Sequence, residues 1–284
     1  MKLFPAPSWT ASLPYEPELR RGPSSTRLGH PLIIPIPARN LKSPPSAASE
    51  SLCRKHGRSL VYAAGLVRDP AMPRPRQVVK IHDWSIFKLL TAGPFKPSKS
   101  WRSFQAACLL QQAGLATPLP LAVMESRLWG FIREDIYICE ELTCCGSLRD
   151  MLKDPGSSHK DIKTCLKSAA EYILAMHDLG IWHRDLNPGN FLVRARNDNL
   201  ELWLIDLGRT RIKTDLSISC RARDLARMDL YGWHEYFFHH YCGSRYDPQD
   251  LMKMARQARI KRNLWRRAVS WSRPLRAKIR SFWV

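Results

Sequence analysis

The pattern of apolar and polar positions predicts strands in the first half of the chain and helices in the second. Residues 59–67 and 77–82 are rich in β-branched and aromatic or apolar residues, and prolines lie between them. This is typical of two strands joined by a long loop. Residues 98–113 then predict a helix, with a serine suited to cap its start and Gly114 just past its end. The first part of the chain therefore resembles a sheet with one helix.

The period of the apolar positions then changes. From residue 158 to residue 178 they recur every three or four residues, which predicts a second helix that Gly180 ends. Two short apolar strands follow at residues 191–193 and 202–205, with a polar turn between them. This order predicts an α+β fold of two lobes, a small β-rich lobe followed by a larger helical lobe.

Four segments follow from this pattern. Residues 1–50 hold ten of the 21 prolines and predict an irregular extension. We expect the β-rich N-lobe at residues 51–140 and the helical C-lobe at residues 141–250. Residues 251–284 form a basic, aromatic C-terminal tail.

Composition narrows the possible surroundings and partners. The net charge is +20, which favours anionic partners. Eight cysteines occur without any Cys-x-x-Cys pair, which argues against a zinc site and suits free thiols in a reducing cytoplasm. The N-terminus lacks the apolar core of a signal peptide, and no apolar stretch approaches the ~20 residues of a spanning helix. These features predict a cytoplasmic protein.

One motif carries chemistry. Residues 183–190 read His-Arg-Asp-Leu-Asn-Pro-Gly-Asn, and residues 205–208 read Ile-Asp-Leu-Gly after an apolar strand. In this spacing Asp185 is placed to accept the proton of an acceptor hydroxyl, while Asn190 and Asp206 offer the hard oxygen ligands that Mg²⁺ prefers. We therefore predict a kinase that uses ATP and Mg²⁺. The structural alternative is a loop that these residues merely brace.

The nucleotide side of the motif is less complete. Lys80 ends a short apolar strand run, the position of a lysine that contacts the ATP phosphates, and Lys88 is its competitor. A glycine-rich loop over the phosphates is nearly absent, with Gly57 as the candidate tip. The predicted helix at 98–113 contains no acidic residue to pair with the lysine. Ser103 and Gln105 lie near the place where a glutamate is expected. This departure raises the question of whether catalysis is intact.

At the connector between the two predicted lobes, Glu140 and Glu141 are interpreted as solvated charges, because connectors usually hold a nucleotide base through backbone groups.

The chain resembles the lipopolysaccharide core kinase family, whose members phosphorylate Kdo or heptose. The resemblance covers about residues 53–245. It rests on residues 79–80, 96–104, 110–122, 180–193 and 223–228, among which the Gly-x-x-Thr-Pro-x-Pro run from Gly114 is the most specific. It implies a protein-kinase-like fold, ATP and Mg²⁺, and a saccharide of the lipopolysaccharide core as acceptor. It also implies that Lys80 contacts ATP, Asp185 is the base, and Asn190 and Asp206 hold metal.

Three alternatives remain open. A eukaryotic-type protein kinase would need an activation segment and an Ala-Pro-Glu sequence, and only 78 residues follow Asp206. A small-molecule phosphotransferase of the aminoglycoside or choline type shares the same three polar residues but normally has a larger acceptor-binding region. A catalytically degenerate kinase fold would explain the missing helix acid, although Asp185, Asn190 and Asp206 are all present.

The tail is rich in basic and aromatic residues and has no acidic residue after Asp250. This mixture suits an interfacial segment on an anionic membrane surface. Together with the resemblance to the lipopolysaccharide core kinases, it implies a peripheral location on the inner face of the bacterial inner membrane. A solvated basic tail is the alternative. No nucleic-acid module is visible, so we expect no nucleic-acid partner. Pro274 is expected to break any single helix in the tail.

Overall fold

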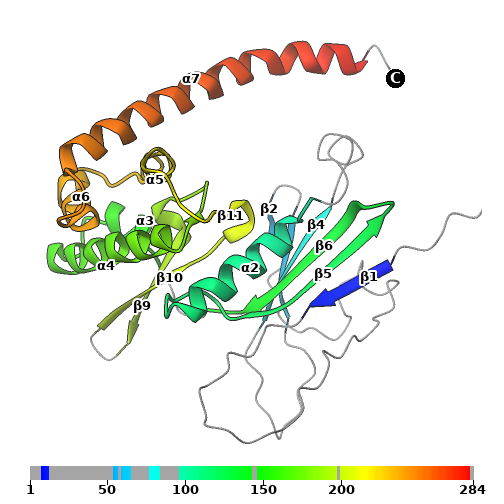
Figure 1. Ribbon diagram of the computed structural model, residues 1–284, viewed down its shortest axis with the longest axis horizontal. Helices are drawn as coiled ribbons and strands as arrows, with labels where there is room; N and C mark the ends of the chain where they lie inside the picture. The colour runs from blue at the N-terminus through cyan, green and yellow to red at the C-terminus, as the bar shows by residue number, and fades with distance from the viewer. Residues whose placement is uncertain are drawn as a thin grey trace, which may run out of the picture. The chain divides into compact units, whose positions relative to one another are not determined.

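The computed structural model describes residues 8–12, 54–56, 59–64, 77–83, 96–142, 146–196 and 199–281 (Figure 1). The chain forms two compact units. The first contains residues 1–145 together with residues 203–210, and the second contains residues 146–202 and 211–284. Gly57 and Lys88, which the sequence suggests as nucleotide-binding candidates, lie outside the described residues.

The first unit is built on a six-stranded antiparallel sheet of order β1-β5-β6-β4-β3-β2. Its strands are β1 (Ser8–Ser12), β2 (Arg54–His56), β3 (Ser59–Ala64), β4 (Gln77–Asp83), β5 (Pro120–Leu128) and β6 (Phe131–Glu140). The two strands predicted around residues 60 and 80 are confirmed as β3 and β4, which pair directly. β1 pairs with β5, so this part of the segment expected to be irregular is a strand.

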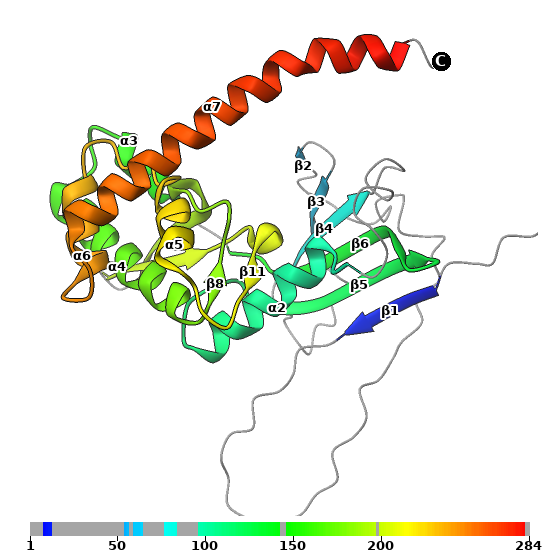
Figure 2. The ribbon, with the colours of Figure 1, turned by 45° about the horizontal axis from the view of Figure 1, so that its top comes forward.

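Helix α2 (Lys99–Gln112) covers one face of this sheet, as Figures 1 and 2 show. Successive strand residues point to opposite faces, and the two faces bury different clusters. Phe104 of α2 packs against Val123, Tyr137 and Cys139 on the covered face. The opposite face holds a second cluster around Ile136. The predicted helix is confirmed, with Ser98 as its N-cap.

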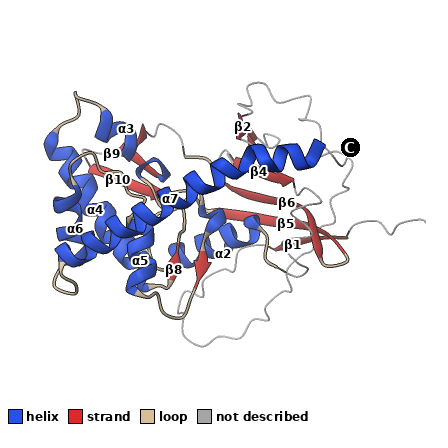
Figure 3. Ribbon diagram, turned by 90° about the horizontal axis from the view of Figure 1, so that it is seen from above, coloured by secondary structure: helices blue, strands red, loops and turns tan. Residues whose placement is uncertain are grey.

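The second unit is mostly helical, with two small antiparallel sheets (Figure 3). Its helices are α3 (Leu148–Lys153), α4 (His159–Asp178), α5 (Ile218–Leu225), α6 (His234–Cys242) and α7 (Pro248–Ser281). One sheet has the order β10-β9-β7, from β7 (Gly146–Ser147), β9 (Phe191–Arg196) and β10 (Asn199–Leu204), and the other pairs β8 (Ile181–Trp182) with β11 (Arg211–Ile212). The end of β10 belongs to the first unit.

The core of the second unit forms around the apolar face of α4. Leu166, Ile173 and Met176 have no exposed surface, and they lie three or seven residues apart on one side of the helix. Tyr172 of the same helix meets the ring of Phe191, the first residue of β9, edge to face. The helical period read from the sequence therefore identified both α4 and the face that it buries.

The expectation that Pro274 breaks the tail is wrong, because α7 continues through it to Ser281. A proline within a helix removes one backbone hydrogen bond, but the flanking segments are rich in arginine, leucine and alanine, which favour the helix. In the figures α7 starts beside α6 and then extends as one long helix (Figures 1 and 2). In the part of the chain that the structure describes, no helix is long and apolar enough to cross a membrane.

Candidate active site

The loop that carries Asp185 starts at a point where only glycine fits. Gly180 follows α4 with φ +73°, and a Cβ there would meet the carbonyl oxygen of Lys213 at 1.8 Å. The same two residues are joined by a hydrogen bond from Lys213 N to Gly180 O of 3.0 Å, next to the β8–β11 pair. The glycine that the sequence marks as the end of the helix therefore also allows the chain to pass close to β11.

Asp224 of α5 holds the backbone of this loop. Its carboxylate accepts hydrogen bonds from the backbone nitrogens of His183, at 2.7 Å, and Arg184, at 2.8 Å. Asp224 has no exposed surface, and hydrogen bonds to a buried carboxylate are stronger than those between neutral groups. Arg184 has φ +66°, a left-handed conformation that persists when its surroundings determine it. Asp224 supplies that constraint.

Asp224 is itself held by a buried histidine. Nε2 of His177, near the end of α4, lies 3.5 Å from an Asp224 oxygen, and its Nδ1 lies 2.7 Å from the hydroxyl of Tyr241. Burial lowers the pKa of His177, against the raising effect of Asp224. The loop is therefore connected through one carboxylate to two helices of the core.

The residues after Asp185 fold back onto its backbone. The carbonyl oxygen of Asp185 accepts hydrogen bonds from the side-chain amides of Asn187, at 3.0 Å, and Asn190, at 2.9 Å. Because the amide nitrogen of Asn190 is used in this bond, its Oδ1 is the atom that a metal ion can bind. The structure thus brings Asp185 and Asn190 together, on the short helix η2 (Pro188–Asn190) and the turn before it.

The carboxylate of Asp185 faces a cation. Nη1 of Arg227, just after α5, lies 3.4 Å from Oδ1 of Asp185, and both side chains are partly exposed. The backbone nitrogen of Asp185 lies 3.2 Å from Nδ1 of the buried His183. The carboxylate is therefore oriented by its neighbours while still open to solvent, as a group that meets a substrate must be.

Asp206 lies in the first unit, where its segment is docked on α2. Leu204 N donates to Ala116 O at 3.0 Å, and Thr117 Oγ1 donates to Leu204 O at 2.8 Å. After Asp206 the short helix η3 (Leu207–Arg209) packs against α2, and a Cβ on Gly208 would lie 3.5 Å from Ser103 Oγ. Asp206 is exposed and left-handed, with φ +61°. Ser103, near the expected site of the missing helix acid, thus faces the segment that carries Asp206.

Lys80 lies on β4, directly opposite Tyr137 of β6. Val78, two residues before it, belongs to the cluster under α2, so Lys80 is on the face that α2 covers. Its positive charge lowers the pKa of the Cys139 thiol, although burial raises that pKa by more. Among the side chains that the structure describes, no carboxylate forms an ion pair with Lys80.

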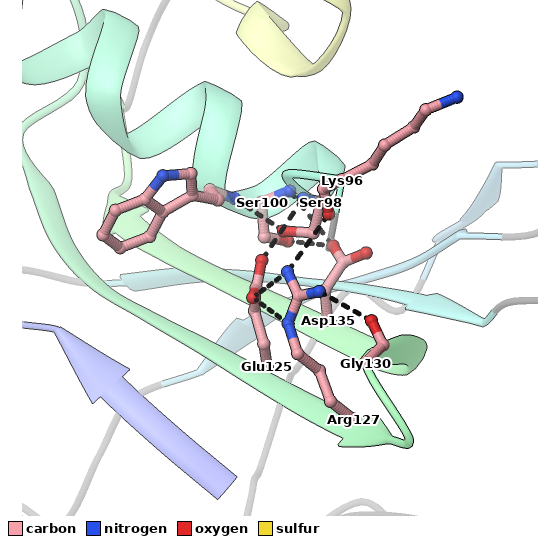
Figure 4. Close-up of polar contacts among 8 residues, drawn as sticks. Lys96, Ser98, Ser100, Glu125, Arg127, Gly130 and Asp135 are labelled. Atoms are coloured by element: carbon pink, nitrogen blue, oxygen red, sulfur yellow. Dashed lines mark hydrogen bonds and ion pairs between the residues drawn. The ribbon is translucent and has the colours of Figure 1, made fainter. Parts of the chain in front are cut away.

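Acidic residues do meet α2, but at its N-terminus (Figure 4). Glu125 of β5 accepts a hydrogen bond from Ser98 N at 3.3 Å, and Asp135 of β6 accepts one from Ser100 N at 3.1 Å. Asp135 also lies 2.8 Å from Nδ1 of His82. Carboxylates at a helix N-terminus satisfy free backbone N–H groups and complement the helix dipole. The sheet therefore supplies the acids that the helix lacks, and it uses them to fix α2.

Arg127 completes this anchor. Its guanidinium pairs with Glu125 at 2.7 Å and donates to the carbonyl oxygens of Gly130, at 3.0 Å, and Lys96, at 3.1 Å (Figure 4). It thus joins β5, the turn before β6 and the approach to α2.

The structure places the predicted residues in two sets. Asp185 and Asn190 belong to the second unit and contact each other, whereas Lys80 and Asp206 belong to the first. Glu140 ends β6, where its backbone nitrogen donates to Leu119 O at 3.0 Å. Sequence reasoning missed the parts played by Asp224 and Arg227. The available signal was an acidic residue on the buried side of the short helix at 218–225.

The comparisons with known proteins identify the family of the chain. The family described as "Lipopolysaccharide kinase (Kdo/WaaP) family" matches residues 51–265. The chain is 30% identical over 132 residues to the 3-deoxy-D-manno-octulosonic acid kinase of Actinobacillus succinogenes, covering 46% of this chain and 52% of that protein. It is 32% identical over 82 residues to a calcium/calmodulin-dependent protein kinase type 1 of Macrobrachium nipponense, and the match covers 28% of this chain and 24% of that kinase. The chain thus spans about a quarter of that calmodulin-dependent kinase and about half of the octulosonic acid kinase.

A solved structure titled "WaaP in complex with acyl carrier protein" is similar in fold. The TM-score is 0.54 at 21% identity, over 72% of this chain and 86% of that one. Together with the mixed helices and strands, this likeness confirms the predicted α+β, protein-kinase-like fold.

Proposed function

Because the chain belongs to the lipopolysaccharide kinase (Kdo/WaaP) family, we propose that it transfers the γ-phosphate of ATP to a hydroxyl of Kdo or heptose in the lipopolysaccharide inner core. The observation that carries this proposal is the braced loop of the second unit, in which Asp185 presents an oriented, accessible carboxylate beside Asn190. Phosphoryl transfer depends on placing such a base and on neutralising phosphate charge.

Each candidate residue has a part in this proposal. Asp185 would accept the proton of the sugar hydroxyl, and Lys80 would contact the phosphates of ATP. Membership of a kinase family implies the use of ATP. Oδ1 of Asn190 and the exposed carboxylate of Asp206 are hard oxygen donors that fit Mg²⁺, which would neutralise the charge of the phosphates when bound. Asp224 would act as a positioning residue, because it holds the loop and not the substrate.

The choice of sugar is supported by the names of two relatives. The kinases of Actinobacillus succinogenes and Mannheimia succiniciproducens, 30% and 29% identical over their matched parts, are both named for 3-deoxy-D-manno-octulosonic acid. Kdo is therefore the first acceptor to test, and heptose the second.

A transfer assay tests the proposal directly. Purified protein would be incubated with radiolabelled ATP, Mg²⁺ and inner-core saccharides that end in Kdo or in heptose, with an aminoglycoside and choline as competing acceptors. We expect label on a core saccharide and none on the small-molecule acceptors. Transfer to an aminoglycoside or choline instead would favour the small-molecule phosphotransferase. Nucleotide binding without transfer to any acceptor would favour the degenerate fold.

We also propose that α7 meets an anionic membrane surface, which would place the enzyme on the inner face of the inner membrane. Ile260 and Leu264 are 52% and 59% exposed, and they lie four residues apart on one face of the helix. Trp265, 66% exposed, is their neighbour. Basic residues surround them, and α7 has no acidic residue after Asp250. Apolar and basic groups on one helix suit a lipid interface.

Vesicle binding tests this part of the proposal. Leu251 and Ala255 of α7 are buried, so the helix should be kept and its exposed face changed. The double variant Ile260→Ala/Leu264→Ala is expected to bind anionic vesicles about 10-fold less tightly, because each side chain gives up apolar contact with lipid. Leu119→Ala, at an exposed leucine of the first unit, is the matched control. Equal binding by the double variant and the wild type would contradict the role of α7.

A further inference from the structure

Arginine residues gather where α7 packs against the end of α5, around the arginine that contacts Asp185. This arginine, Arg227, lies just after α5 and contacts the carboxylate at 3.4 Å. The others come from α7, which packs against α5 within the same unit. They are Arg259, Arg262 and Arg266. We refer to these four residues as the arginine cluster.

The α7 members share one face because they are three and four residues apart. Arg259 fixes the helix in place: its Nε donates to Ala226 O at 3.1 Å, and its Nη2 donates to Met228 O at 2.6 Å. Both carbonyl groups lie at or just past the end of α5. This contact holds the cationic face of α7 toward the residues that follow α5, and Arg227 is one of those residues.

Arg262 is the member whose hydrogen bonding is incomplete. Its Nε is buried, and among the residues that the structure describes it has no hydrogen-bond partner. Burial lowers the pKa of Arg262, the charges of Arg227, Arg259 and Arg266 lower it further, and Asp185 raises it. Three positive charges and one negative charge thus act on a guanidinium whose Nε has no acceptor among the described residues.

The single carboxylate of Asp185 offsets only part of this positive charge, so a second anion would stabilise the cluster. Guanidinium groups side by side repel one another, and a buried N–H without an acceptor keeps its desolvation cost. An anion with several oxygens reduces both the charge repulsion and the desolvation cost. The planar guanidinium of arginine binds carboxylate and phosphate groups through paired hydrogen bonds. The position beside the candidate base indicates that this anion belongs to the molecule whose hydroxyl Asp185 binds.

We propose that Arg227, Arg262 and Arg266 form an acceptor subsite that binds an anionic group of the sugar, a carboxylate or phosphate near the hydroxyl that is phosphorylated. This inference rests on the proposed function and makes it more specific, because the subsite would select acidic or phosphorylated saccharides over neutral ones. Kdo is an acid, so its own carboxylate is one group of the right chemistry. A phosphate elsewhere on the core is the other source.

Arg262→Gln tests the subsite with little risk to the fold, since it keeps most of the side-chain volume and α7 stays anchored by Arg259. We expect the KM for the acceptor to rise about 10- to 100-fold, as for the loss of charge-assisted hydrogen bonds, while the KM for ATP stays within about twofold. Arg262→Lys keeps the charge but loses the paired N–H groups of the guanidinium, so its KM for the acceptor should lie between those of the wild type and Arg262→Gln. Lys261→Ala is the matched control, because it removes an exposed charge from another face of α7.

Modified acceptors identify the anion. If the subsite binds the carboxylate, the methyl ester of the Kdo acceptor should lose affinity for the wild type and show little further loss with Arg262→Gln. If the subsite binds a phosphate, the dephosphorylated acceptor should bind the wild type more weakly and show little further loss with Arg262→Gln. An unchanged acceptor KM in Arg262→Gln, or a raised KM for ATP alone, would overturn the subsite while the proposed function stands.

A binding measurement separates the two proposals. Calorimetry with free Kdo, in the absence of ATP, reports on the subsite without any turnover. Binding to the wild type that is lost in Arg262→Gln supports the subsite even if no transfer is seen and the proposed function fails. No binding to the wild type and no transfer would reject both.

Discussion

Asp185→Ala is expected to lower the rate of phosphate transfer by about 10²–10⁴-fold, the contribution of a positioned general base. The carbonyl oxygen of Asp185, and not its carboxylate, braces the amides of Asn187 and Asn190, so the loop should keep its shape in the variant. We therefore expect kcat to fall while the Kd for ATP and the melting temperature change little. Single-turnover kinetics with saturating acceptor would measure the chemical step.

Two further variants make this result interpretable. Asp185→Asn keeps the size of the side chain and should be about as impaired as alanine, because an amide cannot accept the proton. Asp215→Asn, at an exposed acid of the same unit, should transfer phosphate at the wild-type rate. A kcat for Asp185→Ala within threefold of wild type would rule out its role as the base and return the loop to a purely structural role.

Asp224→Ala is expected to lower both stability and activity. It leaves the backbone nitrogens of His183 and Arg184 without their acceptor and removes the carboxylate beside Nε2 of His177. Two hydrogen bonds to a buried carboxylate are together worth about 3–5 kcal/mol. We expect the free energy of unfolding in urea to fall by about that amount, and kcat to fall in conditions where the variant is folded, because the backbone just before Asp185 is released.

The conservative variant separates positioning from general stability. Asp224→Asn keeps one oxygen and should retain one of the two backbone hydrogen bonds, so its losses should lie between those of wild type and alanine. Asp215→Ala serves as the control for removing an acid from this unit. Unchanged unfolding free energy in Asp224→Ala would show that the two backbone contacts are not what holds the loop.

Local pattern was sufficient for helices α2 and α4 and for the neighbouring strands β3 and β4. The periodic apolar residues of α4, the serine before α2 and the glycines after both helices gave their limits, because caps and helical faces depend on residues only a few positions apart. Strands β3 and β4 were found in the same way, and they pair because they are neighbours in the chain. The spacing from Asp185 to Asn190 likewise lies within one loop, so their contact could be anticipated.

Contacts between distant residues could not be read from the chain. Asp224 holds a loop about 40 positions earlier, and Arg262 lies near a carboxylate 77 positions earlier. Among so many basic residues, no local signal marks the four that form the arginine cluster. The path of α7 past Pro274 also differs from the local expectation, because the propensity of a whole helix outweighs one lost hydrogen bond.

By itself the sequence therefore determined the α+β fold class, helices α2 and α4, and the candidate residues of phosphoryl transfer, since each depends on short-range spacing. Only the tertiary structure decided how those residues are supported: Asp224 under the loop, Asp135 and Glu125 at the start of α2, and the arginine cluster beside Asp185. The physical reason is that buried charges are stabilised by partners that folding brings together, whatever their separation along the chain.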